Sequence, residues 1–142
     1  MTTTGFTVVR GTITTAQMLD LKDTNPLAIP APAADEYVVP LWVHLFMDHA
    51  GTDYVQNAGT DHLALRYTGG VEIDEIGSQA QCTAFLQASA DDNFAWPIGG
   101  IGWIGTIGEG VEWDNNGATD LITGNSPVNY TIAYAIVRSV ST

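Results

Sequence analysis

The sequence predicts an all-β fold, a β-sandwich of jelly-roll type with one or two short helices. Most of its apolar segments are short, rich in β-branched and aromatic residues, and separated by glycine, proline and asparagine turn signals, as in sandwiches and jelly rolls. Only two segments carry helix-start signals. A chain of 142 residues can bury a core without cross-links. Since no linker or repeat interrupts it, we expect a single β domain over residues 1–142.

The first third of the chain predicts a strand, a short helix and a second strand. Residues 6–13 are rich in Thr and Val, which suits a strand near the edge of a sheet. Thr14 precedes Gln17 by the spacing of a capping box, which predicts a helix of about two turns through Leu21. After a short strand, Pro30-Ala31-Pro32 predicts a turn, because its two prolines cannot donate ladder hydrogen bonds.

The strongest strand signal lies at residues 37–47. The β-branched and aromatic residues there, together with Pro40, argue against a helix. They predict a long strand with a bulge or break at Pro40. Trp42 lies within this strand, so we expect its side chain in the core.

The rest of the chain predicts one more helix and several short strands. The helix is expected over residues 78–90, capped by Ser78, with Cys82, Phe85 and Leu86 at the spacing of one buried face. Strands are expected at residues 62–68, 111–113, 120–123 and 129–140.

Two segments are candidates for contacts outside the domain. Residues 1–7 are expected to form a short N-terminal arm. Residues 96–110 place glycines two or three apart among Ile and Trp, which permits close backbone approach or a long wrapping loop. The apolar content of this second segment indicates that it packs against something, so we expect a contact arm.

The charge balance excludes several classes of partner. Four basic residues stand against sixteen acidic ones, for a net charge of -12. Such a chain repels phosphate backbones and anionic lipid surfaces, so we expect neither nucleic acid nor a membrane as partner. Charged residues make up only 14% of the chain, against roughly 25% in an average domain. This scarcity indicates that part of the surface is covered by a protein partner.

The N-terminal sequence and the single cysteine bear on the compartment. Cys82 is the one cysteine, which argues against a disulfide-stapled secreted scaffold. The first residues lack the features of a signal peptide, and no apolar run approaches the roughly 20 residues that span a bilayer. We therefore expect the protein to be made in, and to fold in, a cytoplasm.

The sequence offers no convincing catalytic or metal site. Asp48 and the three histidines, His44, His49 and His62, form the one cluster worth testing as a metal site, but they lack the spacing of the cupin-type metal motif of jelly rolls. No serine lies in a Gly-x-Ser-x-Gly pattern, and the glycines of residues 99–110 lack the ending of a phosphate-binding loop. We expect no enzyme activity, no metal and no cofactor.

Four stretches carry a resemblance to a known group of proteins, and the resemblance as a whole extends over about two-thirds of the chain. They are a Gly-x-Ile-Thr-x-Ala-Gln helix start at residues 11–17, a Pro-Ala-Pro turn at 30–32, a Leu-x-Leu-x-Tyr strand at 63–67, and Thr123-Gly124 followed by a strand at 129–137. In these stretches the chain resembles small structural proteins encoded among the head and tail genes of tailed bacteriophages. Several members of that group look like capsid decoration or cement proteins. The chain departs from the pattern at residues 33–36 and in its long Gly/Trp segment.

The resemblance implies a non-enzymatic virion protein, made in the host cytoplasm. It would bind the outer capsid surface and stabilise contacts between subunits of the major capsid protein. We expect a homo-oligomer, dimeric or trimeric, because charge is scarce and apolar content is high. Composition and position nominate five residues for the contact with the shell: Phe6, Arg10, Trp96, Ile101 and Trp103.

Two alternative functions stay open at this stage. The chain is also compatible with another virion position, such as a head fibre base, a connector or a tail accessory protein. Exposed tryptophans stack on sugars, so a carbohydrate-binding module for attachment to the host surface is the second alternative. For that reading, Trp96 and Trp103 are the candidates for exposed rings.

Overall fold

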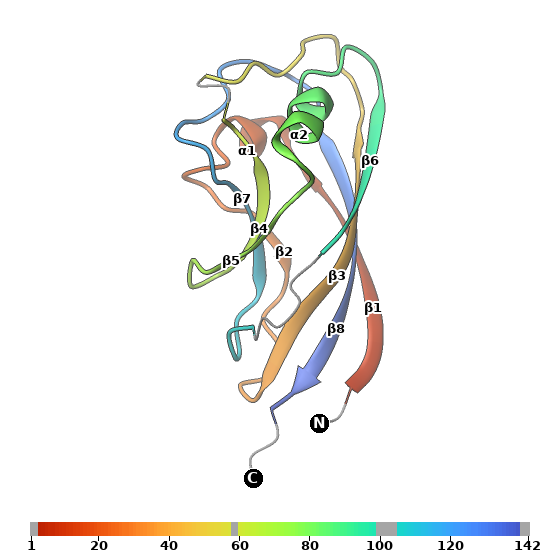
Figure 1. Cartoon of the computed structure of the whole chain (residues 1–142), viewed down its shortest axis with the longest axis vertical. Helices are drawn as coiled ribbons and strands as arrows, with labels where there is room; N and C mark the ends of the chain where they lie inside the picture. The colour runs from red at the N-terminus through yellow and green to blue at the C-terminus, as the bar shows by residue number, and fades with distance from the viewer. Residues whose placement is uncertain (1–2, 58–59, 99–104, 140–142) are drawn as a thin grey trace.

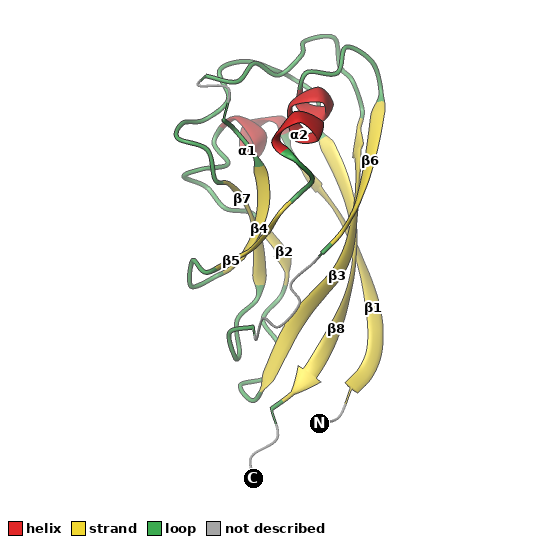
Figure 2. Ribbon diagram, viewed as in Figure 1, coloured by secondary structure: helices red, strands yellow, loops and turns green. Residues whose placement is uncertain are grey.

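The computed structural model describes residues 3–57, 60–98 and 105–139. It shows two antiparallel sheets that face each other, with two short helices near one end (Figure 1; Figure 2). The predicted all-β sandwich with two short helices is therefore confirmed. In chain order the elements are β1 (Thr3–Ile13), α1 (Thr15–Leu19), β2 (Leu27–Ile29), β3 (Glu36–Met47), β4 (Leu63–Tyr67), β5 (Glu72–Glu75), α2 (Gln79–Leu86), β6 (Asp92–Pro97), β7 (Val111–Asn115) and β8 (Val128–Arg138).

Each sheet has four strands. Sheet A has the order β1-β8-β3-β6, and sheet B has the order β2-β7-β4-β5. The long strands β3 and β8 run side by side through the middle of sheet A, from the pair Glu36 and Arg138 to the pair Met47 and Val128. Strands β1 and β6 have a partner on one side only, so they form the two edges of sheet A.

A bulge in β3 decides which side chains of this strand face the core. The register against β8 shifts between Pro40 and Trp42, as predicted for this proline, so Leu41 is an extra residue in β3. The extra residue resets the alternation of side chains, and both Leu41 and Trp42 are exposed, whereas Val43 is buried. The expectation that Trp42 lies in the core is therefore wrong.

Both helices begin with a reciprocal capping box. The Thr14 hydroxyl accepts from the Gln17 amide at 3.2 Å, and the Gln17 side chain accepts from the Thr14 amide at 2.9 Å. Ser78 and Gln81 form the same pair of bonds ahead of α2. Both helices are shorter than predicted. Within the described residues, neither is long and apolar enough to cross a membrane.

Three parts of the strand prediction need correction. Strands β5 and β6 were not predicted, because β5 is acidic and β6 joins an acidic start to a proline end. Residues 120–123 do not form a strand of a sheet, and Thr123 makes only an isolated bridge to Val55.

The core lies between the two sheets and under the helices. Trp113 of β7 is fully buried, and its ring meets that of Tyr130 from β8 edge to face, with 5.3 Å between the ring centroids. Helix α2 buries Cys82, Phe85 and Leu86, as the spacing predicted. Large residues from β1, α1, β2, β3, β4 and the loops complete the core: Ile13, Met18, Leu21, Ile29, Leu45, Met47, Tyr54, Leu65, Tyr67 and Ile76.

The described parts of the two expected arms belong to the sandwich. Residues 3–7 of the expected N-terminal arm are part of β1. Trp96 and Pro97 end β6. At the far end of the Gly-rich segment, Gly110 lies against the turn before β3, where a Cβ would be 2.6 Å from the carbonyl oxygen of Ile29 and 2.9 Å from the amide nitrogen of Ala31.

We expect Gly110→Ala to lower the free energy of unfolding by about 1–3 kcal/mol, the usual cost of overpacking. The added methyl group would press on backbone atoms that cannot move aside as a side chain can. Urea unfolding measures the change. Gly69→Ala is the matched control, because a Cβ there meets only the flexible carboxylate of Glu109. Equal losses in the two variants would contradict the proposed packing at Gly110.

Two buried phenols join separate parts of the fold. Tyr67 of β4 donates a hydrogen bond to the carbonyl of Val38 in β3 at 2.6 Å and so connects the two sheets. Tyr54 donates to the carbonyl of Ser126. Burial raises the pKa of each phenol to about 12, and the carboxylate of Glu109 adds to the rise for Tyr67.

These phenols predict a loss of stability in alkali. Their ordinary pKa is 10.0, so the unfolded chain ionises while the folded chain still holds both protons. Their contribution is complete below pH 10 and is lost as the pH rises towards about 12. Over that interval each phenol lowers the free energy of unfolding by about 1.4 kcal/mol per pH unit. Urea unfolding across the interval measures the slope. Tyr67→Phe should make the slope shallower, and an unchanged slope would contradict this assignment.

Candidate functional site

The outer face of sheet A is the most distinctive surface of the described chain. Its side chains alternate with core residues along each strand, and the strand register aligns them in rows across the sheet. Three rows across β1, β8, β3 and β6 are Thr12, Asn129, Phe46 and Asn93; Arg10, Thr131, His44 and Ala95; and Val8, Ala133, Trp42 and Pro97.

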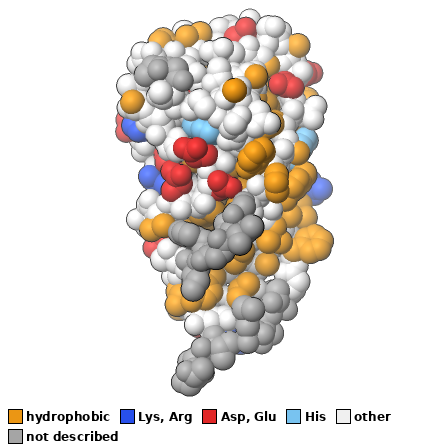
Figure 3. Space-filling view, in the orientation of Figure 1, with side chains coloured by type: hydrophobic (Ala, Val, Ile, Leu, Met, Phe, Trp, Pro, Cys, Tyr) orange, Lys and Arg blue, Asp and Glu red, His pale blue; other side chains and the backbone are white. Residues whose placement is uncertain are grey.

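This face is strongly apolar although no part of the described chain covers it. Phe6 is 72% exposed and Trp42 is 39% exposed, and Val8, Leu41 and Phe46 are exposed as well. Figure 3 shows hydrophobic side chains gathered along the side of the molecule that sheet A forms, whereas acidic side chains gather over the region of β5. Contiguous exposed apolar surface of this kind marks interaction sites on soluble proteins.

The charges on this face differ from those of the chain as a whole. The chain carries sixteen acidic residues. None of them is among the outward side chains of the four strands, counted from Phe6 in β1 to Pro97 in β6, whereas Arg10 and His44 are. Within the described residues, Arg66 and Arg138 each form ion pairs with two carboxylates, and Arg10 forms none. Arg10 is thus a cation available to a partner.

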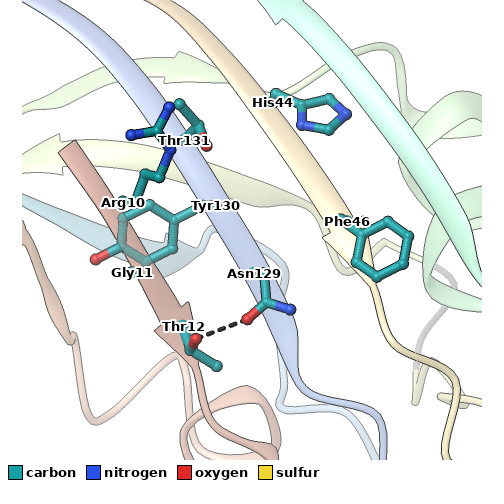
Figure 4. A pocket seen from close by; sticks show the side chains of 8 residues that line it. All are labelled: Arg10, Gly11, Thr12, His44, Phe46, Asn129, Tyr130 and Thr131. Carbon is teal, nitrogen blue, oxygen red and sulfur yellow. Dashed lines mark hydrogen bonds between the residues drawn. The ribbon is translucent and has the colours of Figure 1, made fainter. Parts of the chain in front are cut away.

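A shallow hollow of about 370 Å³ lies on the upper part of this face. Figure 4 shows the side chains that line it, with Arg10 and Thr131 on one side and Phe46 on the other. The Thr12 hydroxyl donates to the Asn129 side-chain oxygen at 2.6 Å at the lower end of the hollow in this view. Beside it, the rings of Trp42 and His44 stack with their centroids 5.9 Å apart and their planes 7° apart. This part of the face therefore combines an aromatic platform beside the hollow with amide and hydroxyl groups within it.

The structure separates the five residues that the sequence nominated for contacts. Phe6 and Arg10 both lie on the outer face of sheet A, two rows apart. Trp96 is half-buried on the inner side of β6, where its ring stacks on Phe94 at a centroid distance of 6.2 Å. Ile101 and Trp103 lie outside the described residues. Sequence reasoning missed Trp42 and Phe46, because only the strand register shows that they share one face. It also missed Leu41, the exposed extra residue of the bulge beside Trp42.

The histidines tested as a metal cluster do not converge in the described part of the chain. The Nε2 atom of His49 pairs with Asp53 at 2.8 Å. His62 is buried, and its Nε2 atom donates to the carbonyls of Ile76 and Gly77. His44 lies apart from both, on the outer face of sheet A.

Two further groups bear on chemistry. Burial raises the pKa of the Cys82 thiol to about 11, so this cysteine is a neutral core residue at neutral pH. The carboxylates of Asp20, Asp23 and Asp120 approach within 4.8 Å of one another, a grouping that the sequence did not predict. All three are at or near the surface, and the Asp120 carboxylate accepts a hydrogen bond from the backbone amide of Lys22 at 3.0 Å.

Comparison with known proteins gives little further guidance. No family model matches the chain, and no curated protein matches it. A chain described as "Cyanophage Pam1 capsid asymmetric unit" aligns with 94% of this chain and 81% of its own length, at 18% identity and a TM-score of 0.42. A similarity at this level identifies neither a family nor a function.

Proposed function

We propose that this chain is a non-enzymatic structural protein of a tailed-phage virion. In this proposal it decorates the outer surface of the capsid and cements neighbouring subunits of the major capsid protein. The observation that carries the proposal is the outer face of sheet A, which is apolar, exposed and free of carboxylates in an otherwise acidic chain. The assignment to a phage virion rests on the sequence resemblance to phage structural proteins.

The motifs that carry the resemblance build the scaffold of the fold. Residues 11–17 run from the end of β1 through the cap and first turn of α1, and residues 63–67 form β4. Residues 129–137 lie within β8. These motifs therefore support the proposal that the chain is a structural protein, and the outer face of sheet A supports the proposal that it binds other capsid subunits.

The chemistry of the face fits a protein partner. Large exposed rings such as Phe6 and Trp42 are the residue types that dominate binding energy at interfaces. Arg10, which has no carboxylate partner in the described chain, fits a carboxylate on the opposite surface. Many copies bound across subunit boundaries would raise the free energy needed to open the shell, even if each contact were modest.

Cosedimentation with shells assembled without this protein tests the proposal. We expect saturation at a fixed, simple ratio of bound copies to major capsid subunits, together with a higher melting temperature of the shell. The ratio would give the symmetry of the binding sites. Absence of binding would contradict the cement function and would favour a connector, head fibre or tail position.

One observation favours carbohydrate binding as a second candidate function. Trp42 is exposed and stacks on His44, which lines the hollow together with Asn129 and Thr131 on the same face. An exposed ring next to amide and hydroxyl groups is suited to stacking on a sugar and bonding its hydroxyls. Quenching of tryptophan fluorescence by host-surface glycans, abolished in Trp42→Phe, would support this function over cementing.

A further inference from the structure

The four edge strands of the sandwich are protected to very different degrees. In sheet B, β2 has three residues and β5 has four, of which three are acidic. In sheet A, β6 has six residues, ends at Pro97 and contacts α2. The remaining edge, β1, has eleven residues and contains no acidic residue and no proline. Proteins usually prevent an edge strand from pairing with another chain by keeping it short, by placing charges or prolines in it, or by covering it with another element. Strand β1 has few of these features.

The free side of β1 has unused backbone groups. Strand β1 pairs with β8 on one side only, so alternate amides and carbonyls point away from the sheet. In the part of the chain that the structure describes, no hydrogen bond outside the ladders uses a backbone group of Thr3–Ile13. These groups can pair with another extended strand.

The charge distribution points to a second copy of the chain as the occupant. Two copies with a net charge of -12 each repel one another, so association is most favourable through a surface that lacks acidic residues. Strand β1 meets that condition, and its one charged residue is the unpaired Arg10. Phe6, which lies two rows from Arg10 on the same face, is 72% exposed.

We propose that two copies of this chain pair β1 to β1 in antiparallel fashion, about a two-fold axis at Val8. In this register Phe6 of one copy lies opposite Arg10 of the partner subunit, and each guanidinium can stack on a ring. The pairing joins the two copies of sheet A into one sheet of eight strands. Strand β1 has a bulge at Gly5, whose φ is +84°. Regular pairing between the two copies is therefore limited to the residues of β1 that follow Gly5.

The pairing gives the dimer one continuous outer face. A two-fold axis perpendicular to the sheet keeps the two outer faces on the same side of the joined sheet. Two copies of the apolar surface around Trp42 would then lie next to each other. A dimer of this form could contact two sites at once, which raises its apparent affinity without any new contact.

The mass of the purified protein, measured by sedimentation equilibrium without shells, tests the proposal first. We expect a dimer. Val8→Lys should give a monomer, because it places two cations on the axis, whereas Val8→Thr should remain a dimer. Val8 is exposed, so both changes are compatible with folding. A wild-type monomer at every concentration, a trimer, or a dimer that persists in Val8→Lys would overturn the proposal.

Oxidative cross-linking tests the register. Two copies of Val8→Cys would place their thiols across the axis, within the range of a disulfide, and we expect most of this variant to become a covalent dimer. Thr12→Cys is the matched control, because its two thiols would be roughly 27 Å apart at about 3.4 Å per residue. Buried Cys82 does not interfere. Equal cross-linking of the two variants would overturn the register.

The inference does not depend on shell binding. Trp42→Glu leaves β1 unchanged, so this variant should keep the mass of the dimer. A dimer that fails to bind shells would contradict the proposed function alone, and a monomer that binds shells would contradict this inference alone.

Discussion

Trp42→Glu is expected to weaken binding to assembled shells by about 100-fold, which corresponds to about 2.8 kcal/mol. Trp42 lies between Ala133 and Pro97 in a row of the outer face of sheet A. Removing a central aromatic residue of this kind typically costs more than about 2 kcal/mol, and a carboxylate held against an apolar partner adds a desolvation cost. A binding isotherm from cosedimentation measures the loss.

Ile122→Glu is the matched control for this variant. Ile122 is 55% exposed, and it lies in the connection between β7 and β8, away from the outer face of sheet A. The substitution adds the same charge to an apolar residue, so we expect binding within about twofold of the wild type, as for a surface change outside the contact. Equal losses in the two variants would assign the effect to net charge. Unchanged binding in Trp42→Glu would remove this face from the proposed contact.

The elements that the sequence predicted well are those set by neighbouring residues. The capping boxes at Thr14 and Ser78 are made by side chains three residues apart, so the sequence alone shows both partners. The end of α1 was predicted less well. Asp20 leaves the helical region with a φ of −129°, and its carboxylate accepts a hydrogen bond from the hydroxyl of Thr24.

Trp42 shows where prediction from local pattern stops. The bulge at Pro40 was predicted, since proline cannot donate to the ladder. The side of the sheet on which the following residues emerge depends on how many residues the bulge inserts relative to β8. That number is set by the pairing of strands about ninety positions apart in sequence, as Pro40 and Tyr134 are, so the burial of Trp42 could not be inferred locally.

The candidate site could be predicted only in part for the same reason. Phe6 and Arg10 lie in one strand and were nominated together. Strands β1 and β8 contain no acidic residue, but only the register shows that their outward side chains share one face with those of β3 and β6. Strand β6 was also missed, although Phe94 and Trp96 alternate inwards with Asn93 and Ala95 outwards.

Trp113→Ala is expected to have the largest effect on stability, lowering the free energy of unfolding by about 3–5 kcal/mol. The Trp113 side chain is fully buried between the sheets and packs edge to face on Tyr130. Its removal leaves a cavity between the sheets. The sheets cannot move together to close it, because β4, beside β7 in sheet B, and β8, in the facing sheet A, are each held by hydrogen bonds to neighbouring strands. Urea unfolding followed by circular dichroism measures the loss.

Trp96→Ala provides the comparison that isolates burial between the sheets. It removes the same side chain from an edge strand, where Trp96 is only half-buried and stacks on Phe94. Solvent can fill much of the space that it leaves, so the loss should be about half that of Trp113→Ala or less. A loss as large as that of Trp113→Ala would show that the edge at β6 contributes as much to stability as the centre of the sandwich, contrary to this account of the core.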